Sequence, residues 1–537
     1  MADVIKPCDF YPSIFNDVIG PVMRGPSSSH CAAALRIGRM ARDLMEGKIE
    51  EVLVHFDPRG SVAETHKTQG SDIGLFAGFL GWEADDERLT ESAAALEEAG
   101  IKARIEIREF QATHPNTYRL KLTNASERHE MTALSTGGGM IEVTEIDGIP
   151  LSLRGDCWET LVFLDSRGKE ALEWLSRHGE ADRVILHQHG DSELVEIKGQ
   201  RFIDADTASL FRSTFPVRSL KTLPPLLPVL WRKGIRIPFI TCGEMLRFNQ
   251  GKDLPLWELA VAYESARGRL PGDEVYRKMK DLVRILEKSI REGLQGTVYE
   301  DRILGCQSQQ YREHMVRGRL LDAGMLNQVI LFVTAMMEVK SAMGVIVASP
   351  TAGSCGALPG ACLGAASSMG LGEDEITRAM LAAGMIGVFI SAHSTFAAEV
   401  GGCQAECGAG SAMAAAALIS LAEGSVQQSV DAASMALQNI LGMVCDPVAN
   451  RVEVPCLGKN VLAAANALAC ANMALAGFDA VIPLDEVIDT MDAVGRSLPP
   501  ELRCTGRGGL SVTPTARKIE RQLQTRISKH EIRNKLQ

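Results

Sequence analysis

The sequence predicts a multidomain protein with an N-terminal α+β domain, a small βαββ module and a C-terminal all-α domain. Three observations support this. The chain has 537 residues and a mass of 58.0 kDa, too long for one hydrophobic core. Short alternating runs fill its first part, and beyond about residue 235 the apolar residues recur with helical spacing. The predicted boundaries are 1–155 for the α+β domain, 156–222 for the module, 223–235 for a linker, 236–516 for the helical domain and 517–537 for a basic tail.

The α+β domain is predicted from period-two alternation. Alternating or β-branched runs occupy residues 51–56, 102–110, 118–122 and 140–146, and Gly, Pro, Asn and Asp separate them. Such runs are typical of a mostly antiparallel sheet with one buried face. Helices are predicted at 31–45 and 91–98.

The module follows with a different order of elements. A strand is predicted at 160–165, a helix at 169–176, and two further strands at 183–188 and 193–197. The Pro-rich run LPPLLP at 223–228 then predicts a linker.

The helical domain is predicted from apolar residues three and four apart. Small Ala and Gly side chains dominate its centre and allow close helix packing. Helices are predicted at 256–266, 272–292, 325–343, 373–392, 410–422, 429–441, 460–475 and 484–494, and a further helix begins near Ala357.

Composition narrows the functional classes. The 56 Lys and Arg against 67 Asp and Glu give a net charge of -11, which disfavours nucleic acid as a partner. The 13 Cys are odd in number and follow no secretory signal pattern, so we expect reduced thiols in a cytoplasmic protein. Charged residues interrupt the apolar stretch 376–422, which predicts buried helices rather than a membrane span.

Three cysteine-bearing turns in the helical domain are candidates for metal binding. They contain Cys403, Cys445 and Cys456, each beside Gly or Pro, at spacings unlike the paired knuckles of structural zinc. Thiolates on rigid turns can hold an iron-sulfur cluster, but buried cysteines at helix ends would look the same. Spacing alone leaves both interpretations open.

Hydroxyl- and glycine-rich turns are candidates for binding an anionic group. The run 349–356 precedes a helix, as does 25–30, and open N–H groups at helix starts favour carboxylates. Simple capping would explain the run 349–356 equally well, whereas the three hydroxyls and one imidazole of 25–30 are more than a cap requires. Gly137 and Gly138 could form an anion nest or an ordinary turn, and His114 in the turn HPNT could be catalytic or structural.

Taken together, several ordered strings resemble the iron-sulfur-dependent L-serine dehydratases in their single-chain form, with the β part first and the α part second. The resemblance covers nearly the whole chain. The 156–222 module resembles a degenerate version of the ACT-like insert of some members. The strings are GPSSSH (25–30), HPNT (114–117), TGGGMIEVTEIDG (136–148), ASPTAGSCGALPG (348–360), FAAEVGGCQAECGAGSAMAAAAL (396–418) and CDPVANRVEVPCLGKN (445–460).

The resemblance implies a lyase that eliminates water from L-serine and gives pyruvate and ammonia. It implies that Cys403, Cys445 and Cys456 hold a [4Fe-4S] cluster with one iron left open as a Lewis acid, so that pyridoxal phosphate is not needed. The site is expected between the two halves. The implied proton-handling residues are His114, His30, His66 and Lys67, and the implied substrate-binding residues are Ser27, Ser28, Ser29, Gly137, Gly138, Thr351, Gly353 and Ser354.

The chain departs from the family pattern in two places. Members commonly read GKGHGTD where this chain has Gln69, and an amide cannot exchange protons near neutral pH. Either His66 replaces the missing imidazole or the substrate differs. The chain also lacks the C-terminal cysteine that caps the open iron in some members, so Cys504, water or nothing from the protein takes that position.

Three alternatives remain at this stage. The same chemistry could act on another small amino acid such as L-cysteine or L-threonine, or the protein could be a non-catalytic amino-acid sensor. A pyridoxal phosphate lyase is disfavoured, because Lys340 and Lys459 look like surface or supporting charges rather than Schiff-base lysines. We expect a homodimer acting on a small molecule, away from membranes and nucleic acids.

Overall fold

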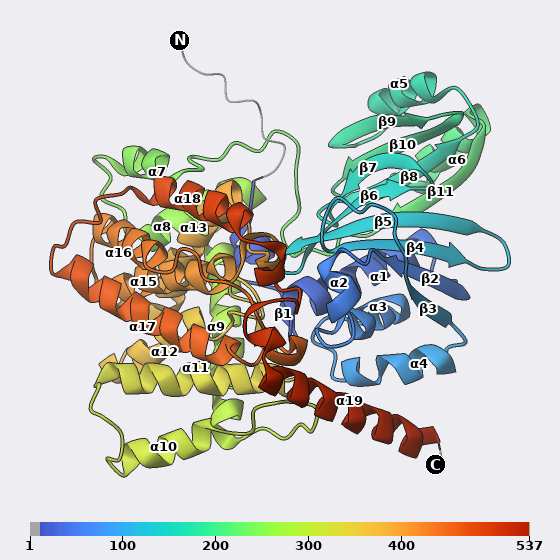
Figure 1. Ribbon diagram of the computed structural model, residues 1–537. Coiled ribbons are helices and arrows are strands. Elements are labelled where there is room, and N and C mark those ends of the chain that lie inside the picture. Colours follow the sequence, from blue (N-terminus) through green and yellow to red (C-terminus); the bar gives the residue numbers. More distant parts are fainter. Residues whose placement is uncertain (1–10, 536–537) are drawn as a thin grey trace. The chain divides into compact units, whose positions relative to one another are not determined.

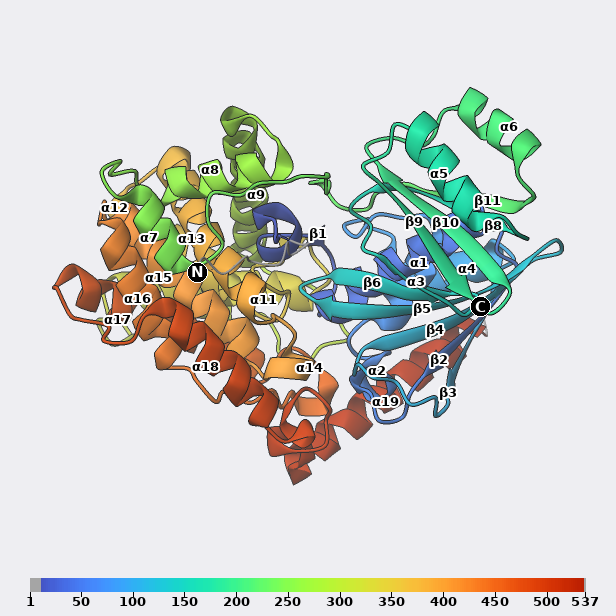
Figure 2. The same cartoon turned by 90° about the horizontal axis from the view of Figure 1, so that it is seen from above.

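The computed structural model describes residues 11–535 and divides the chain into two compact units. One runs from Ser29 to Ile235, and the other joins the described residues up to Ser28 to those from Arg236 onward. Figure 1 shows sheets and helices in the first and mainly helices in the second, and Figure 2 gives a second view. The predicted mixture of several sheets with a helical C-terminal region is confirmed.

The unit from Ser29 to Ile235 contains a six-stranded sheet in the order β3-β2-β4-β5-β6-β7. Only β2 and β3 run parallel, so the sheet is mostly antiparallel as predicted. The strands are β2 (Glu51–Phe56), β3 (Lys102–Ile107), β4 (Thr117–Thr123), β5 (Arg128–Gly137), β6 (Met140–Ile146) and β7 (Ile149–Leu153).

Sequence analysis missed β5 and β7. Along β5 the inward positions include His129 and Ser135, both buried, so polar residues hide the alternation that marks a half-buried strand. The strand is placed by its neighbours on either side, β4 and β6, rather than by its own composition.

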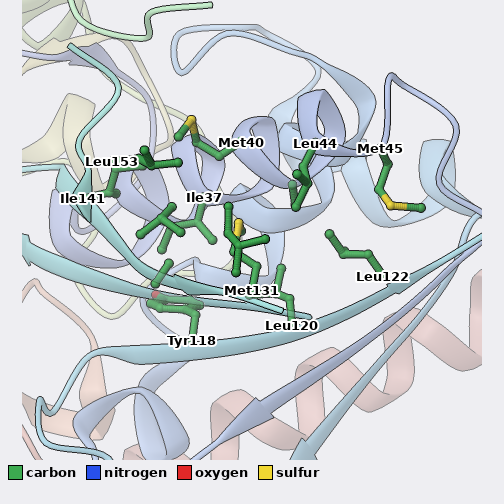
Figure 3. Close-up of a cluster of buried hydrophobic side chains, with 14 of the residues drawn as sticks. Ile37, Met40, Leu44, Met45, Tyr118, Leu120, Leu122, Met131, Ile141 and Leu153 are labelled. Carbon is green, nitrogen blue, oxygen red and sulfur yellow. The ribbon is translucent and has the colours of Figure 1, made fainter. Parts of the chain in front are cut away.

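Helices cover one face of this sheet. Ile37, Met40 and Leu44 of α1 (Ala33–Leu44) pack on Tyr118 and Met131 from the strands, as Figure 3 shows. Helix α3 (Ser71–Leu80) packs on α1, and α2 (Ser61–Thr65) and α4 (Ser92–Glu98) complete the layer. The two predicted helices are present as α1 and α4, and α2 and α3 were not predicted.

Helices α1 and α3 approach closely because Gly78 has no side chain. A Cβ at Gly78 would lie 2.2 Å from the Leu35 carbonyl oxygen. We expect Gly78→Ala to lower the free energy of unfolding by about 3 kcal/mol, since the two backbones must separate. Gly305→Ala, where no heavy atom lies within 4 Å, should change it by less than about 0.5 kcal/mol. Urea unfolding of both variants measures this, and equal effects would contradict it.

The second sheet of this unit is four-stranded and antiparallel, in the order β11-β8-β10-β9. Helices α5 and α6 alternate with its strands, so the order is βαββαβ rather than the predicted βαββ. Residues 205–214 bury only Phe211, which explains why their helix was missed. The elements are β8 (Trp158–Leu164), α5 (Gly168–His178), β9 (Arg183–His189), β10 (Ser192–Gly199), α6 (Ala205–Thr214) and β11 (Val217–Leu223).

A buried ionic network lies on the sheet face opposite α5 and α6. The Lys198 ammonium lies 2.9 Å from the Glu159 carboxyl and 2.7 Å from that of Glu196, and His187 contacts Glu196 at 2.6 Å. Burial raises the pKa of Glu159 to about 8, although the Lys198 charge opposes this. Burial opposes ionisation of Glu196 too, but hydrogen bonds from His187 and Lys198 lower its pKa. The two carboxyls therefore share one ammonium unequally, and Glu159 retains its proton.

This network predicts a stability that depends on pH. The folded Glu159 keeps a proton that the unfolded chain releases above its ordinary pKa of 4.5, so its contribution falls as pH rises through about 8. We expect Glu159→Gln to flatten this dependence and to raise the melting temperature at pH 9 by about 2 to 4 °C, or about 1 kcal/mol. Thermal unfolding at pH 6 and 9 measures it. Glu170→Gln, on the exposed face of α5, is the control and should have the same melting temperature as the unaltered protein at both pH values. If the melting temperature of Glu159→Gln changed with pH as much as that of the unaltered protein, the prediction would be contradicted.

The helical unit is built around α15 (Ala409–Leu421). This Ala-rich helix packs against four neighbours, and nearly all of it is buried. The neighbours are α12 (Ala357–Met369), α13 (Glu373–His393), α16 (Val426–Gln438) and α17 (Cys456–Leu475). The remaining helices are α7 (Cys242–Asn249), α8 (Leu256–Gly268), α9 (Gly272–Gln295), α10 (Ser308–Val316), α11 (Met325–Ser341), α14 (Ala398–Gly401), α18 (Leu484–Ser497) and α19 (Pro514–Lys535).

The predicted helices of this unit are present, with boundaries that differ by a few residues. Helices α7, α10 and α14 were not predicted. The predicted basic tail lies largely in α19, and its residues 536–537 lie outside the described part.

The described N-terminal segment belongs to the helical unit, whereas the prediction placed it in domain 1–155. Its turn η1 (Ile14–Val18) packs on α13, where a Cβ at Gly387 would lie 2.1 Å from Val18. The Ser13 hydroxyl donates to Glu264 at 2.5 Å. Strand β1 (Val22–Met23) then pairs with β12 (Ile346–Val347), a small exception to an all-α unit. These contacts are non-local, so chain order did not indicate them.

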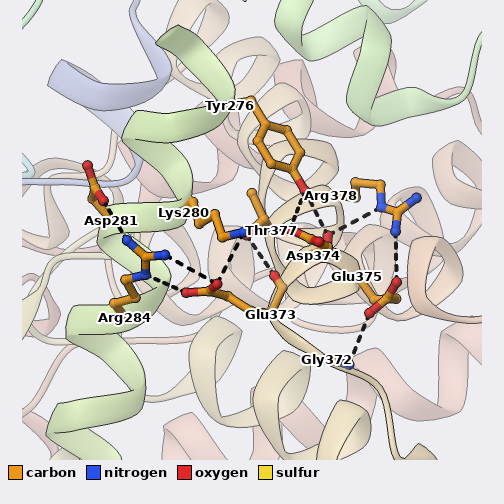
Figure 4. Close-up of polar contacts among 10 residues, drawn as sticks. All are labelled: Tyr276, Lys280, Asp281, Arg284, Gly372, Glu373, Asp374, Glu375, Thr377 and Arg378. Carbon is orange, nitrogen blue, oxygen red and sulfur yellow. Dashed lines mark hydrogen bonds and ion pairs between the residues drawn. The ribbon is translucent and has the colours of Figure 1, made fainter. Parts of the chain in front are cut away.

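Helix α13 is a core helix with a charged start. It is long and apolar enough to cross a membrane, but 78% of its apolar window is buried inside the fold. At its N-terminus Glu373 and Asp374 pair with Lys280 and Arg284 of α9, as Figure 4 shows. Acidic residues at a helix start complement the helix dipole, so this end suits the surface.

Candidate active site

The hydroxyl-rich turn before α12 forms a closed hydrogen-bonded arrangement in the helical unit. The Thr351 hydroxyl lies 3.1 Å from that of Ser354 and accepts from the Ser354 N–H at 3.2 Å. The N–H of Ala352 donates to the Ser28 hydroxyl at 3.1 Å. Ser28 of the string GPSSSH and the string ASPTAGSCG, more than 300 residues apart, thus meet within the helical unit.

Glu406 is a partly buried carboxyl at this turn that was not predicted from the sequence. It accepts a hydrogen bond from the Thr351 hydroxyl at 2.7 Å. Burial raises its pKa, although Thr351 and the charges of Lys340 and Lys459 lower it in part. A Cβ at Gly353 would lie 2.9 Å from a Glu406 oxygen, which explains why glycine occupies that position.

Asn460 joins the hydroxyl turn to the cysteines. Its Oδ1 accepts from the N–H groups of Gly356 and Ala357 at the start of α12, at 3.1 and 2.9 Å. Its Nδ2 donates to the carbonyls of Gly353 and Cys456 at 2.9 and 2.8 Å. The side chain is fully buried, so one amide fixes three segments. Asn460 lies in the quoted string LGKN, but its partners could not be known from the sequence.

Cys403, Cys445 and Cys456 are all buried in this unit, and Cys445 lies in an extended segment that pairs with Arg503 rather than at the predicted helix boundary. Cys456 begins α17, and Cys403 precedes the turn η4 (Gln404–Gly408). The thiols of Cys445 and Cys456 each interact electrostatically with Cys403, so the three turns converge.

Two further cysteines belong to this group. A hydrogen bond with Cys403 is the main cause that raises the pKa of Cys407, and a hydrogen bond with Cys504 is the main cause that raises that of Cys445. The Cys504 N–H also donates to the Cys445 carbonyl at 2.9 Å. Cys407 was visible in the string GCQAECG, and Cys504 was considered only as a possible cap.

Two ammonium groups balance charge near these thiols. Lys459 donates to the Val444 carbonyl at 2.6 Å and pairs with Asp446 at 2.8 Å. Lys340 is fully buried and donates to the Val452 carbonyl, so of the two predicted roles, a surface charge or a supporting charge, the surface role is wrong. A buried cation is tolerated where a carbonyl faces it. Burial raises the pKa of the Cys456 thiol, and the Lys340 charge lowers it in part.

The other unit carries the predicted histidines. The Thr65 hydroxyl donates to the Ser61 carbonyl, so the Nε2 of His30, 2.8 Å away, must itself donate to Thr65. Burial lowers the pKa of His30 to about 3, and the nearby His66 adds to this. His30 is therefore neutral, with its proton on Nε2.

His66 is arranged differently. Its Nδ1 lies 2.6 Å from a carboxylate oxygen of Asp72, so Nδ1 carries the proton and Nε2 has a lone pair. The ring packs on Phe56 with centroids 5.3 Å apart. Of the predicted residues in this segment, Lys67 is exposed and Gln69 is buried. Among the predicted histidines, His66 is the one oriented by a carboxylate.

The HPNT turn leads into β4. Its carbonyls accept hydrogen bonds from the N–H of Ser61 at the start of α2 and from the N–H of Ser135 in β5. The Asn116 N–H donates to His114 Nδ1 at 3.1 Å, which leaves the proton of a neutral His114 on Nε2. Burial lowers the pKa of His114. The side chain of Asn116 is fully buried and makes no hydrogen bond to the described residues, a costly state that a polar ligand would relieve. The motif was identified in the sequence, but Asn116 was not predicted as a site residue.

The glycine run forms the turn between β5 and β6. Gly137, Gly138 and Gly139 all have positive φ, a conformation that favours glycine. Arg36 of α1 donates to the Gly139 carbonyl at 2.6 Å and fixes the turn. The predicted residues are therefore divided between the units. The helical unit holds Ser27, Ser28, Thr351, Gly353, Ser354 and the cysteines, and the other holds Ser29, His30, His66, Lys67, His114, Gly137 and Gly138.

Comparison with known proteins agrees with this arrangement. A family model described as serine dehydratase alpha chain matches residues 251–511. A probable L-serine dehydratase α chain of Bacillus subtilis is 35% identical over 285 residues, which are 53% of this chain and 95% of that protein. The chain belongs to the L-serine dehydratase family.

The match extends beyond the α part. An L-serine dehydratase of Helicobacter pylori is 26% identical over 496 residues, 91% of this chain and 96% of that one. A probable L-serine dehydratase β chain of Bacillus subtilis is 42% identical over 146 residues, 27% of this chain and 65% of that one. The resemblance to single-chain members of the L-serine dehydratase family is confirmed.

Proposed function

We propose that the protein is an L-serine ammonia-lyase that eliminates water from L-serine to give pyruvate and ammonia. The observation that carries the proposal is the joining of the hydroxyl turn and the cysteine turns through Asn460. One side chain thereby joins the turn proposed to bind the substrate carboxylate to the cysteines proposed to bind the metal, which supports an elimination of hydroxide.

We infer that Cys403, Cys445 and Cys456 hold a [4Fe-4S] cluster. The donor set fits, because three converging buried thiols lie on rigid turns with Lys340 and Lys459 near them. No three His, Cys, Asp or Glu side chains within residues 11–525 are grouped to hold a single metal ion, whereas a cluster of several irons separates its ligands more widely. When bound, the cluster would supply a Lewis-acidic iron to the substrate hydroxyl.

The hydroxyl turn would hold the substrate carboxylate. Within residues 11–535, the N–H of Gly353 makes no hydrogen bond, and the hydroxyls of Thr351 and Ser354 lie beside it. The raised pKa of Glu406 favours its protonated form, which limits repulsion of an anionic substrate. Ser28 fixes the turn through the Ala352 N–H.

Two histidines would carry the two proton transfers of the reaction, one as the acceptor and the other as the donor. His66 is suited to accept a proton at Nε2, because Asp72 holds its other nitrogen. His114 is suited to donate from Nε2, and His30 and Lys67 would support the charge of these groups. His66 would thus supply the imidazole that Gln69 does not. Ser27, Ser29, Gly137 and Gly138 remain proposed substrate contacts.

The small module and the oligomeric state complete the proposal. The βαββαβ order of the module supports an ACT-like regulatory role. We propose a cytoplasmic homodimer that uses no pyridoxal phosphate.

The test is anaerobic reconstitution with iron and sulfide, followed by a substrate panel. We expect about four irons per chain, broad visible absorbance and pyruvate from L-serine, with His66→Gln reducing kcat at least a hundredfold and leaving the iron content unchanged. A fully active iron-free protein would overturn the proposal. A cluster-free protein that binds serine without turnover would favour a sensor instead.

A second substrate class is favoured by one observation. Gln69 is buried in the segment where members commonly have histidine, so the groups around the substrate differ. The panel therefore includes L-threonine and L-cysteine. A kcat/KM for either that exceeds that for L-serine more than about a hundredfold, or about 2.7 kcal/mol, would reassign the substrate within the same chemistry.

A further inference from the structure

A pocket of about 570 Å³ opens on the six-stranded sheet, apart from the proposed active-site residues. Residues of β2, β4 and the segment 108–111 line it, and all belong to the unit from Ser29 to Ile235. Val54 and Leu120 point into the core with α1, so their neighbours His55, Arg119 and Lys121 point to the opposite face. The pocket thus lies on the sheet face away from α1.

The pocket is positively charged in an acidic protein. Arg108, Arg119 and Lys121 line it against the single carboxylate of Glu109, although the chain carries a net charge of -11. The sheet register places His55 directly opposite Arg119. Like charges gathered on one wall repel one another, and an anion between them would relieve that cost.

Both guanidinium groups that line the pocket, those of Arg108 and Arg119, can accept a ligand. Lys121 pairs with Glu130 at 2.7 Å, but Arg119 only stacks on the Phe110 ring, 5.6 Å from its centroid. The guanidinium of Arg108 makes no hydrogen bond or ion pair with the residues that the structure describes. Guanidinium groups bind carboxylate and phosphate oxygens through paired N–H donors.

His55 supplies a second, independent indication. Its side chain is 3% exposed, yet its Nε2 is buried without a hydrogen bond, and its nearest partner is Glu106 at 3.6 Å. Buried ring nitrogens are normally bonded. Burial lowers the pKa of His55, so a neutral ring with an unbonded nitrogen lies in the wall of this pocket.

The wall formed by 108–111 is held in place. Asp57 accepts hydrogen bonds from the N–H groups of Phe110 and Ala112 at 3.2 and 3.1 Å, and another from Arg59. Gln111 adopts a positive φ of 56°, which this anchoring enforces. A preformed wall lowers the entropic cost of binding.

We propose that this pocket binds a small dianion carrying a phosphate group, held by the guanidinium groups of Arg108 and Arg119 with Lys121 and His55 beside them. Three cationic side chains and one imidazole match the several terminal oxygens of a phosphate better than the two of a single carboxylate. The site goes beyond the proposed lyase activity and does not depend on it.

The test is calorimetric titration of the full chain with inorganic phosphate and, at matched ionic strength, with malonate. We expect saturable phosphate binding that Arg108→Gln/Arg119→Gln weakens at least tenfold and Arg108→Gln alone weakens measurably. Arg128→Gln removes the same charge from an exposed residue on the same sheet face outside this pocket, and should change affinity less than twofold.

Three results would overturn the proposal. They are the absence of saturable phosphate binding, equal weakening by Arg128→Gln, and tighter binding of malonate than of phosphate. The first two would indicate only diffuse charge attraction, and the third would assign the pocket to carboxylates. Melting temperatures of the variants show that each is folded, and serine turnover is measured separately so that failure of the lyase proposal cannot be mistaken for failure of this one.

Discussion

Replacing Cys456 with serine is expected to lower serine deamination at least a thousandfold and to prevent assembly of a complete iron-sulfur cluster. Cys456 is buried at the start of α17, and its thiol interacts electrostatically with Cys403 and Lys340. A serine hydroxyl is a poor ligand for iron in such clusters. Iron content, visible absorbance and pyruvate formation on the anaerobically reconstituted variant measure the effect.

Cys470→Ser is the matched control, because it lies on the same helix and is equally buried. Its partners are the side chains of Asn439 and Asn466, with no contact to the hydroxyl turn. It should keep the cluster and most of the activity. A Cys456→Ser protein with full iron and full activity would remove Cys456 from the ligand set and leave the metal proposal without one of its three turns.

The parts of the fold that could be predicted from sequence are those specified by local patterns. Strands β2 and β6 and helix α9 have apolar residues at their own periods, and α13 is marked by a long apolar run, so each is marked by its own residues. Strand β5 buries His129 and Ser135, and α6 buries only Phe211, so neighbours rather than composition determine them. The same holds for the N-terminal segment, whose packing on α13 is set by contacts far away in sequence.

The candidate site shows the same division. Cys403, Thr351 and His66 could be selected because their residue types and neighbouring glycines indicate chemistry on their own. Glu406 and Asn460 could not, because what defines them is a partner 55 or more than 100 residues away. Glu and Asn side chains are mostly exposed in proteins, so their residue types alone do not mark a buried role, which is defined only when the chain is folded.

Replacing Asn460 with alanine is expected to destabilise the helical unit by about 3 kcal/mol and to reduce kcat at least a hundredfold. The change leaves two buried N–H groups at the start of α12 and two carbonyls without their partners, and each buried unpaired group costs about 1 to 3 kcal/mol. The loss of activity follows because Gly353 and Cys456 are no longer fixed relative to each other. Urea unfolding of the cluster-free chain and kinetics of the reconstituted protein measure the two effects.

Two further variants separate positioning from stability. Asn460→Asp keeps the oxygen that caps Gly356 and Ala357 but faces the carbonyls of Gly353 and Cys456 with oxygen instead of N–H, so it should lose more activity than stability. Asn466→Ala, on the same helix, removes bonds to Ser411 and Ala436 and should cost stability while kcat is retained. If all three variants lost kcat only in proportion to their stability, Asn460 would be a structural residue, and the link between the hydroxyl turn and the cysteines would have no part in the reaction.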